Sequence, residues 1–341
     1  SIRRQRQMCI RDRCTIMEAV MDRQLSLEFA RITEQAALKS ARLVGLGDKE
    51  GADQAAVDGM HEQFALTPVS GTVVIGEGEI DEAPMLYIGE HVGQGGEEVD
   101  IAVDPVEGTN LVAKGKNGAI AVLAIAPKGC LLHAPDMYRQ KICVGPRAKG
   151  RIDIRASVTE NLKNVADAMG REVSDLTMVI LDRERHEKII REAREAGARV
   201  YLITDGDVVP SVDCGIQGSG IHMVMGSGGA PEGVLSAVGL KCLGGDMQAR
   251  LLPQTEQEIQ RLHTMGIDDP NKVLTLDDLV KGDDCIFAET AITDCAMLRG
   301  VRFFGGGART STLVLRYKTG TVRFIDTVHR FGEDKPGVRM F

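Results

Sequence analysis

Apolar side chains recur along this chain with two distinct periods, which predict where helices give way to strands. Residues 22–44 carry an apolar side chain at every third or fourth position, as expected of an amphipathic helix. A second helix, with its apolar positions between residues 57 and 64, follows a polar loop. β-Branched and aliphatic runs at 71–75, 99–103 and 118–126 are typical of buried strands.

From about residue 157 the pattern changes to a regular alternation of short strands and helices. The expected elements are helices over 160–169, 186–196 and 254–265, and strands over 177–181, 199–203 and 221–225. Such alternation predicts parallel strands whose carboxyl ends share one edge of a sheet. Near the end of the chain, β-branched runs flank a Lys-Thr-Gly turn at 318–320 and predict an antiparallel hairpin. We therefore expect an α/β protein with mixed sheets.

Composition and charge narrow the range of partners. The chain has 341 residues, 43% of them hydrophobic, and a formal net charge of −8. Because its body contains no basic run, neither nucleic acid nor an anionic membrane is an expected partner. No apolar run is long enough to span a bilayer. The eight cysteines form no C-x-x-C pair and mostly lie in apolar runs, so we expect free thiols in a reducing cytoplasm.

Residues 1–16 differ from the rest because they are rich in arginine and lack periodicity. They fit a remnant of an organelle-targeting segment, a basic arm, or sequence foreign to the native protein. We favour the last interpretation, and the fold is argued without them.

Two carboxylates follow the run at 99–103. Asp104 precedes Pro105, whose missing N–H predicts that the strand ends there, and Glu107 comes two residues later. Ligands of open α/β sheets collect at this carboxyl edge. An isolated Asp-Pro favours a plain turn with a capping Asp and a solvated Glu. Further acidic residues upstream favour a functional site instead.

Carboxylates recur at the ends of other expected elements. Glu77 lies between two glycines after a strand, and Glu232 follows a glycine-rich turn. Asp53 falls near the start of the second helix, where an N-cap is the better interpretation on its own. Together with Asp104 and Glu107, these side chains offer only oxygen ligands. Such ligands select hard cations such as Mg²⁺, Mn²⁺ or Ca²⁺. Several converging carboxylates suggest more than one ion, and two-metal sites suit in-line displacement at phosphorus, where Thr109 could orient the attacking water.

Groups suited to a phosphate or a sugar follow the later strands. Gly226–Gly229 precedes a helix and is a weak candidate for a phosphate cradle, although it is neither a dinucleotide fingerprint nor a P-loop. Arg183 and Arg185 could neutralise a second phosphate, but without other support a solvated helix start is the better interpretation. Asp205 and Asp207 could accept sugar hydroxyls, or could form only a turn and a helix cap.

Three motifs together resemble the lithium-sensitive sugar and inositol phosphatase superfamily. They are Gly-Glu-Gly-Glu at 76–79, Asp-Pro-Val-Glu-Gly-Thr at 104–109 and Gly-Ala-Pro-Glu-Gly at 229–233. Within that superfamily the chain closely resembles class II fructose-1,6-bisphosphatases, through the stretch 75–89 and Ala-Pro-Asp-Met-Tyr at 134–138. The resemblance covers nearly the whole chain.

This resemblance implies a layered α-β-α-β-α sandwich. It implies a metal-binding half over 17–155, a sugar-phosphate-binding half over 156–330 and a tail over 331–341. The implied reaction is metal-dependent hydrolysis of the 1-phosphate of fructose 1,6-bisphosphate.

The resemblance also implies residue roles. The implied ligands of Mg²⁺ or Mn²⁺ are Asp53, Glu77, Asp104, Glu107 and Glu232, and the implied catalytic residues are Thr109, Asp53 and Glu107. The implied substrate contacts are Glu107, Gly108, Thr109, Tyr138, Arg183, Glu184, Arg185, Asp205, Gly206, Asp207 and Gly229. Glu184 departs from the family, which often has proline at this position.

Residues 300–307 are similar to the cyanobacterial branch, whose members also hydrolyse sedoheptulose 1,7-bisphosphate, so dual specificity is a hypothesis. The family further implies a homodimer or homotetramer. One alternative is an inositol monophosphatase-like enzyme, which the pair Arg183 and Arg185 argues against. Another is a catalytically silent sugar-phosphate-binding protein, which the full carboxylate set with Thr109 argues against.

Overall fold

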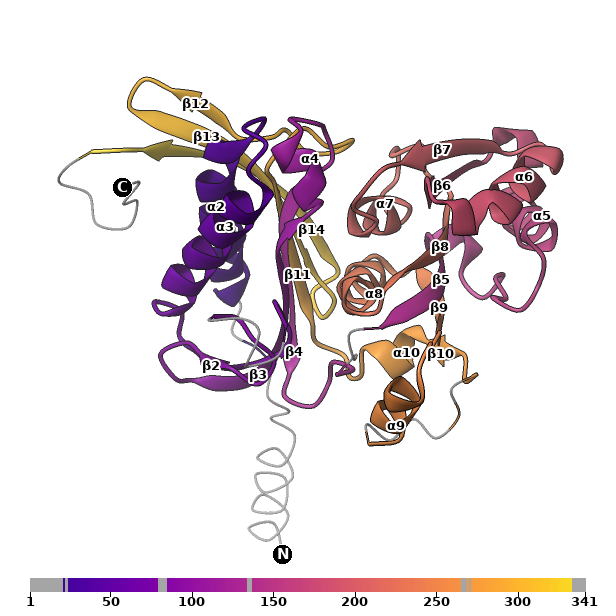
Figure 1. Ribbon diagram of the computed structural model, residues 1–341, viewed down its shortest axis with the longest axis horizontal. Helices are drawn as coiled ribbons and strands as arrows, with labels where there is room; N and C mark the ends of the chain where they lie inside the picture. Colours follow the sequence, from indigo (N-terminus) through magenta and orange to yellow (C-terminus); the bar gives the residue numbers. More distant parts are fainter. Residues whose placement is uncertain are drawn as a thin grey trace, which may run out of the picture.

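The molecule is built from five layers that alternate between helices and sheets (Figure 1). The computed structural model describes residues 21, 24–78, 85–133, 137–264, 269 and 271–332. Across the molecule, the helical layers are α2 (Leu25–Ser40) with α3 (Lys49–Phe64), then α7 (Val208–Asp213) with α8 (Pro231–Leu243), then α5 (Val158–Met169) with α6 (Glu187–Glu195). One sheet lies in each gap between these layers, which confirms the expected α-β-α-β-α sandwich.

The first sheet has eight strands, which pair in the order β12-β13-β11-β4-β3-β1-β2, with β14 on β13. Their bounds are β1 Val69–Ile75, β2 His91–Val92, β3 Glu97–Glu107, β4 Ile120–Pro127, β11 Ile286–Ala291, β12 Arg302–Phe304, β13 Gly307–Arg316 and β14 Thr321–Arg330. The expected terminal hairpin is confirmed as the β13–β14 pair. β1 and β3 are parallel, so their carboxyl ends lie at one edge.

The second sheet has six strands in the order β10-β9-β5-β8-β6-β7. Their bounds are β5 Tyr138–Val144, β6 Thr177–Leu181, β7 Arg199–Ile203, β8 Met223–Gly229, β9 Asp246–Leu251 and β10 Leu274–Thr275. β6 is parallel to both β7 and β8, as the alternation of strands and helices predicted. β5 and β9 add antiparallel strands. The chain thus enters the second sheet before residue 144 and rejoins the first at 286, whereas we expected one division near 155.

The remaining elements are short and connect the layers. They are α4 Thr109–Ala113, α9 Glu256–Thr264, α10 Leu276–Leu279, and the 3₁₀ turns Ala41–Leu43, Pro146–Ala148, Val173–Asp175 and Glu184–His186. No helix among the described residues is long and apolar enough to cross a membrane. The expectations for residues 1–16, for the motif parts in 79–84 and 134–136, and for the tail from 333 lie outside the described residues.

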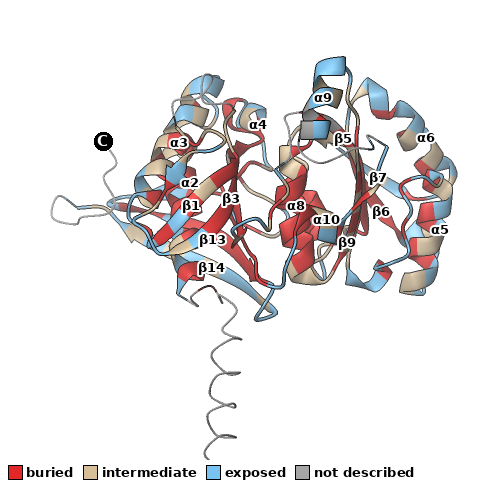
Figure 2. Cartoon of the chain, turned by 90° about the horizontal axis from the view of Figure 1, so that it is seen from below, coloured by how far each residue is buried: buried red, intermediate tan, exposed pale blue. Residues whose placement is uncertain are grey.

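Three hydrophobic cores separate the layers. Phe64 lies in the core between α2–α3 and the first sheet, and Leu162 in the core between the second sheet and α5–α6. The third core surrounds α8, whose buried side chains include Val234, Leu235 and Val238. A helix that is apolar on all sides must be covered on all sides. This explains why α8 lies between the two sheets and is buried in Figure 2.

The N-terminal helices differ from expectation at their ends. The helix expected over 22–44 becomes a 3₁₀ turn after Ser40. The next helix begins at Lys49, and the Asp48 carboxylate accepts a hydrogen bond from Gly51 N at 2.8 Å. Asp48 is therefore the N-cap, and the capping interpretation of Asp53 is wrong. Asp53 lies one turn inside the helix, where its side chain has another role.

Candidate active site

A β-bulge in β3 brings Asp104 and Glu107 to the same face of the first sheet. β3 does not end at Pro105, as we expected, but continues to Glu107. Asp104 lies opposite Val122 and Glu107 opposite Ile120, so one extra residue stands on the β3 side. In a regular strand, residues three apart face opposite sides. Pro105 lacks an N–H, which suits the interrupted ladder, and the bulge turns both carboxylates toward the α7–α8 layer.

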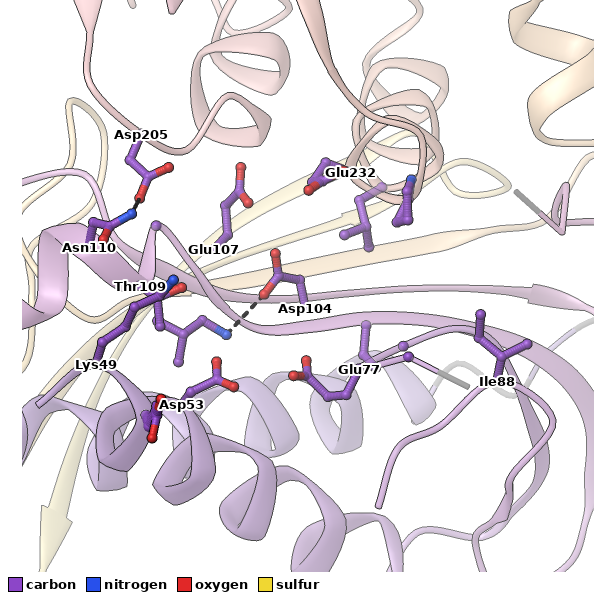
Figure 3. Close-up of a pocket in the computed structure, with 18 residues that line it drawn as sticks. Lys49, Asp53, Glu77, Ile88, Asp104, Glu107, Thr109, Asn110, Asp205 and Glu232 are labelled. Carbon is purple, nitrogen blue, oxygen red and sulfur yellow. Dashed lines mark hydrogen bonds between the residues drawn. The ribbon is translucent and has the colours of Figure 1, made fainter. Parts of the chain in front are cut away.

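Asp53 and Glu77 lie near Asp104 but come from other elements than β3. Asp53 projects from the first turns of α3, and Glu77 follows the carboxyl end of β1. Their carboxylates face each other below Asp104 in Figure 3. The Gly76 backbone packs so closely on Leu86 that a Cβ at residue 76 would lie 1.9 Å from the Leu86 carbonyl oxygen. Only glycine fits there, and this close contact fixes where Glu77 begins.

Glu232 completes the set from the first turn of α8. Pro231 occupies the start of that helix, where its missing N–H is not needed. Gly229 ends β8, and a Cβ there would lie 2.2 Å from Glu232 Oε2. Gly229 therefore leaves the space that the Glu232 carboxylate occupies.

These five carboxylates line one cavity of about 610 Å³, which we call the carboxylate cavity (Figure 3). Its wall also includes the expected site residues Gly108, Thr109 and Asp205. The structure thus brings all the expected metal ligands to one cavity, although they come from α3, the turn after β1, β3 and α8. Asn110 Nδ2 donates to Asp205 Oδ2 at 2.9 Å, which ties the second half of the chain to the wall.

Burial and mutual repulsion raise the pKa values of these carboxylates. Burial, with the charge of Asp53, raises the pKa of Glu77 to about 8. Burial and the charge of Glu77 raise the pKa of Asp104 well above its ordinary value, and burial with Asp104 does the same for the pKa of Glu107. The pKa of Glu232 is raised by burial and by the charge of Asp207. Such a site favours either protons or cations between the carboxylates.

The carboxylate cavity suits hard divalent ions. Its candidate ligands are all carboxylate oxygens, which match Mg²⁺ or Mn²⁺ better than softer metals. Glu232 Oε2 is buried and has no hydrogen-bond partner within the described part of the chain. Among the described side chains, no three acidic, His or Cys residues are grouped closely enough to hold one ion.

Backbone donors hold Glu107 in place. The N–H groups of Asp207 and Val208 both donate to Glu107 Oε1, at 2.8 and 3.1 Å. Gly206 directly precedes them with a left-handed φ of +69°, and a Cβ there would approach Glu107 to 3.8 Å. The Asp205-Gly206-Asp207 turn therefore supports the site through its backbone as well as its side chains.

Two buried cations behind the carboxylate cavity were not anticipated. Lys141 Nζ donates to Asp207 Oδ1 at 2.5 Å, and Arg139 Nη1 donates to Ala230 O at 3.0 Å. Both cationic side chains are only 1% exposed. Their positive charges oppose the rise in the pKa of Glu232. Two cations at alternate positions of a buried strand were the sequence feature that could have revealed them.

Lys49 was also missed as a lining residue. It lies in the first turn of α3 and contributes a cationic side chain to the carboxylate cavity. Its charge opposes the rise in the pKa of Asp53. Its position directly after the N-cap Asp48 became clear only once the helix start was known.

The expected distal-phosphate residues lie outside the wall of the carboxylate cavity. Arg183 Nη2 donates to Thr204 O at 2.8 Å, and Arg185 donates to both Ser227 Oγ and Ser227 O. These contacts join the carboxyl ends of β6, β7 and β8, which confirms that these strands end at one edge. Glu184 is exposed in the 3₁₀ turn beside them.

Tyr138, whose side chain is outside the description, begins β5 and pairs with Gly229. Gly229 is the last residue of β8, and Glu232 follows shortly after it in the first turn of α8. Tyr138 is therefore placed at the same sheet edge as the expected sugar contacts.

Comparison with known proteins identifies the family. The model of bacterial fructose-1,6-bisphosphatase, glpX-encoded, matches residues 23–329. A D-fructose 1,6-bisphosphatase class 2/sedoheptulose 1,7-bisphosphatase of Synechococcus sp. (strain JA-2-3B'a(2-13)) is 50% identical, over 94% of this chain and 100% of the relative. Proteins with the same name from Crocosphaera subtropica and Synechococcus elongatus are 48% and 46% identical, over 91% and 92% of this chain and 97% and 99% of those relatives. The chain belongs to the glpX-encoded family of bacterial fructose-1,6-bisphosphatases.

Proposed function

We propose that the carboxylate cavity hydrolyses the 1-phosphate of fructose 1,6-bisphosphate to give fructose 6-phosphate and inorganic phosphate. The observation that carries this proposal is the convergence of Asp53, Glu77, Asp104, Glu107 and Glu232 on one cavity beside Thr109. Phosphatases of this family are metal-dependent. Family membership and the acidic cavity thus support the same chemistry.

The five carboxylates would hold Mg²⁺ or Mn²⁺. When bound, such ions polarise the phosphate and lower the pKa of an attacking water. Glu107 is held in position by two backbone N–H groups. The Thr109 hydroxyl, two residues further on, is proposed to orient the water for in-line attack, with Asp53 across the cavity.

The rest of the substrate is proposed to extend toward the carboxyl ends of β6, β7 and β8. Arg183 and Arg185 carry positive charge suited to the distal phosphate. Asp205, which reaches the wall of the carboxylate cavity, is proposed to accept a sugar hydroxyl, with Tyr138 and Gly229 beside it. Asp207 is already bound to Lys141, so its proposed contribution is to hold Glu107 through its backbone.

Sedoheptulose 1,7-bisphosphate is proposed as a second substrate. The relatives described above carry this activity in their names. Both sugars share the phosphate end that meets the carboxylates, and a longer pocket can accept one further hydroxymethylene. We also propose a cytoplasmic enzyme, since the described cysteines are free thiols, as expected in a reducing compartment.

The proposal is tested by measuring phosphate release from both bisphosphates, with Mg²⁺, with Mn²⁺ and with EDTA. We expect activity on fructose 1,6-bisphosphate that requires the added ion. Inositol 1-phosphate serves as the comparison substrate. Faster release from inositol 1-phosphate would identify an inositol monophosphatase, and no release from any substrate would identify a sugar-phosphate-binding protein.

Glu107→Gln is the decisive variant. Gln retains an Oε1 that can accept from Asp207 and Val208, so the turn is preserved while the charge is lost. We expect kcat to fall at least ~100-fold with an unchanged circular dichroism spectrum. Glu98→Gln is the matched control, because Glu98 lies on the same strand, is 64% exposed and forms an ion pair with Lys128. Full activity in Glu107→Gln would refute its role as a ligand.

A further inference from the structure

A second polar cavity lies at the opposite edge of the second sheet from the carboxylate cavity. It has a volume of about 650 Å³ and is lined by the amino ends of β6 and β7, the turn after β5, the end of α5 and the loop over 215–222. Because β6, β7 and β8 are parallel, this edge is remote from the one that carries the expected substrate residues. The cavity plays no part in the function proposed above.

The side chains of this cavity are strongly one-sided in charge. Arg147, Arg171 and Arg199 line it, whereas no Asp or Glu does so among the described residues. We call it the arginine cavity. Three arginines together are notable in a chain with a net charge of −8. A wall of one sign attracts ligands of the opposite sign.

These arginines are not neutralised by carboxylates. Arg147 donates to Met169 O and Arg199 donates to Asp175 O, each at 2.5 Å. Within the described part of the chain, none of the three forms an ion pair. Backbone contacts use only part of the donor capacity of a guanidinium, which carries five N–H groups.

His222 adds a contact that the protein alone does not satisfy. Thr177 N donates to His222 Nδ1 at 2.9 Å, so in the neutral ring the proton is on Nε2. Arg171 Nη1 lies 2.8 Å from that same Nε2. Two donors therefore face each other. Burial, with the charges of Arg171 and Arg199, lowers the pKa of His222 against the opposing charge of Asp175, which keeps the ring neutral. An anion bound beside these two groups could accept from both, which would relieve the contact between the two donors.

The size and the remaining wall indicate a small organic molecule rather than a bare ion. Pockets of roughly 300–1,000 Å³ are typical for small ligands. Tyr201 stands at the rim with 59% of its surface exposed, and Ile216 and Ile221 provide apolar contacts. At Gly218 and Gly220 a Cβ would meet nothing within 4 Å, so the backbone of the loop is open to an approaching group.

We propose that the arginine cavity binds the phosphate group of a small phosphorylated molecule, through Arg171, Arg199 and His222. The phosphate oxygens accept hydrogen bonds from the guanidinium groups and from His222 Nε2. The organic part lies over the apolar wall beside Tyr201. This site is separate from the carboxylate cavity and does not depend on its chemistry.

The test uses the full chain in EDTA, which removes the cations that would draw a phosphate into the carboxylate cavity. The seven histidines are labelled at Cε1, and the His222 resonance is assigned from its loss in His222→Gln. Ribose 5-phosphate and inorganic phosphate are the probes, and ribose is the neutral control. We expect saturable movement of the His222 signal with both phosphates and none with ribose. We also expect the pKa of His222 to rise on binding.

Variants separate this site from the expected substrate site. Arg171→Ala and Arg199→Ala should each weaken binding of ribose 5-phosphate about tenfold. Arg151→Ala is the matched control, because Arg151 is exposed and paired with Asp167, and it should leave affinity unchanged. Thermal unfolding checks that each variant is folded. Should Arg171→Ala unfold, Arg199→Ala, whose side chain is exposed on β7, carries the test alone.

Two results would overturn the inference. In the first, ribose 5-phosphate binds but the His222 signal does not move, and binding is lost in Arg185→Ala. This would place the ligand at the expected substrate site. The other is unchanged affinity in folded Arg171→Ala and Arg199→Ala.

Discussion

At the scale of single residues, the carboxylate cavity depends on side chains that are absent as much as on those that are present. Gly76 allows β1 to pack on Leu86, and Gly229 leaves room for Glu232. Pro105 accompanies the bulge that sets Asp104 and Glu107 on one face. Each of these residues shapes the backbone. The backbone in turn sets where each carboxylate side chain begins.

Gly229→Ala tests this interpretation. The added Cβ would displace the Glu232 carboxylate, which is the flexible end of a side chain, so stability should change little. We expect Mn²⁺ to bind about tenfold more weakly in isothermal titration, because one ligand is moved. Gly305→Ala is the control, since a Cβ there meets nothing within 4 Å. Unchanged Mn²⁺ affinity in Gly229→Ala would show that Glu232 is not a ligand.

At the scale of elements, the central layer of α7 and α8 packs between the two sheets. This packing buries acidic side chains. Asp213 on α7 and Glu289 on β11 are each 1% exposed. Neither Asp213 carboxylate oxygen has a hydrogen-bond partner in the described structure. Burial raises the pKa of Asp213 to about 7, and burial with the charge of Asp213 raises the pKa of Glu289 well above its ordinary value. The two groups therefore favour their protonated forms.

The stability of the fold should accordingly depend on pH through Asp213. Its pKa is 3.8 in an ordinary setting and about 7 when folded, so between these values the folded state holds a proton that the unfolded state has released. The free energy of unfolding therefore falls as pH rises from about 4 to about 7, by about 2–4 kcal/mol. Asp213→Asn should remove this loss and raise Tm at pH 8 by about 5 °C.

Thermal unfolding in EDTA at pH 5 and pH 8 measures the effect without bound ions. Asp167→Asn provides the control, because that side chain is 73% exposed and paired with Arg151. Equal pH dependence in Asp213→Asn and in the wild-type protein would mean that Asp213 is ionised in the folded state.

At the scale of the whole molecule, the edge strand β14 of the first sheet exposes apolar side chains within the described part of the chain. β14 pairs with β13 and, within the described residues, with no other strand. Val322, Phe324 and Val328 lie on one face of β14, which also carries the exposed Asp326, and they are 46%, 50% and 52% exposed. An exposed apolar face on an edge strand is typical of a contact with another chain. We propose on this basis that the chain forms the homodimer or homotetramer that the family resemblance implies.

Phe324→Asp tests that proposal. A charge in the middle of this face should prevent association, because it would be buried without a partner. Light scattering during size-exclusion chromatography should give a multiple of 36.8 kDa for the wild-type protein and about one chain mass for the variant. Leu66→Asp, at an equally exposed position beyond α3, should behave as the wild-type protein. An unchanged mass for Phe324→Asp would place the interface elsewhere.

The sequence by itself determined the elements and the types of residue at the active site. Periodicity predicted the two N-terminal helices, the strands β6, β7 and β8, and the terminal hairpin, because the spacing of apolar positions along each element is a local property. The clustered Asp and Glu residues, with the motifs around them, determined the chemistry and the family. Periodicity and motifs are local properties, so they can be seen directly in the order of the residues.

Only the tertiary structure decided which residues meet. The pattern at Asp104-Pro105 indicated the end of a strand, but pairing with β4 turned it into a bulge. Asp53 was ambiguous until Asp48 was found to cap the helix. Lys141, Arg139 and the return of β11 to the first sheet depend on contacts between residues far apart in the chain. Because burial, charge pairing and register arise from those distant contacts, no local pattern could have fixed them.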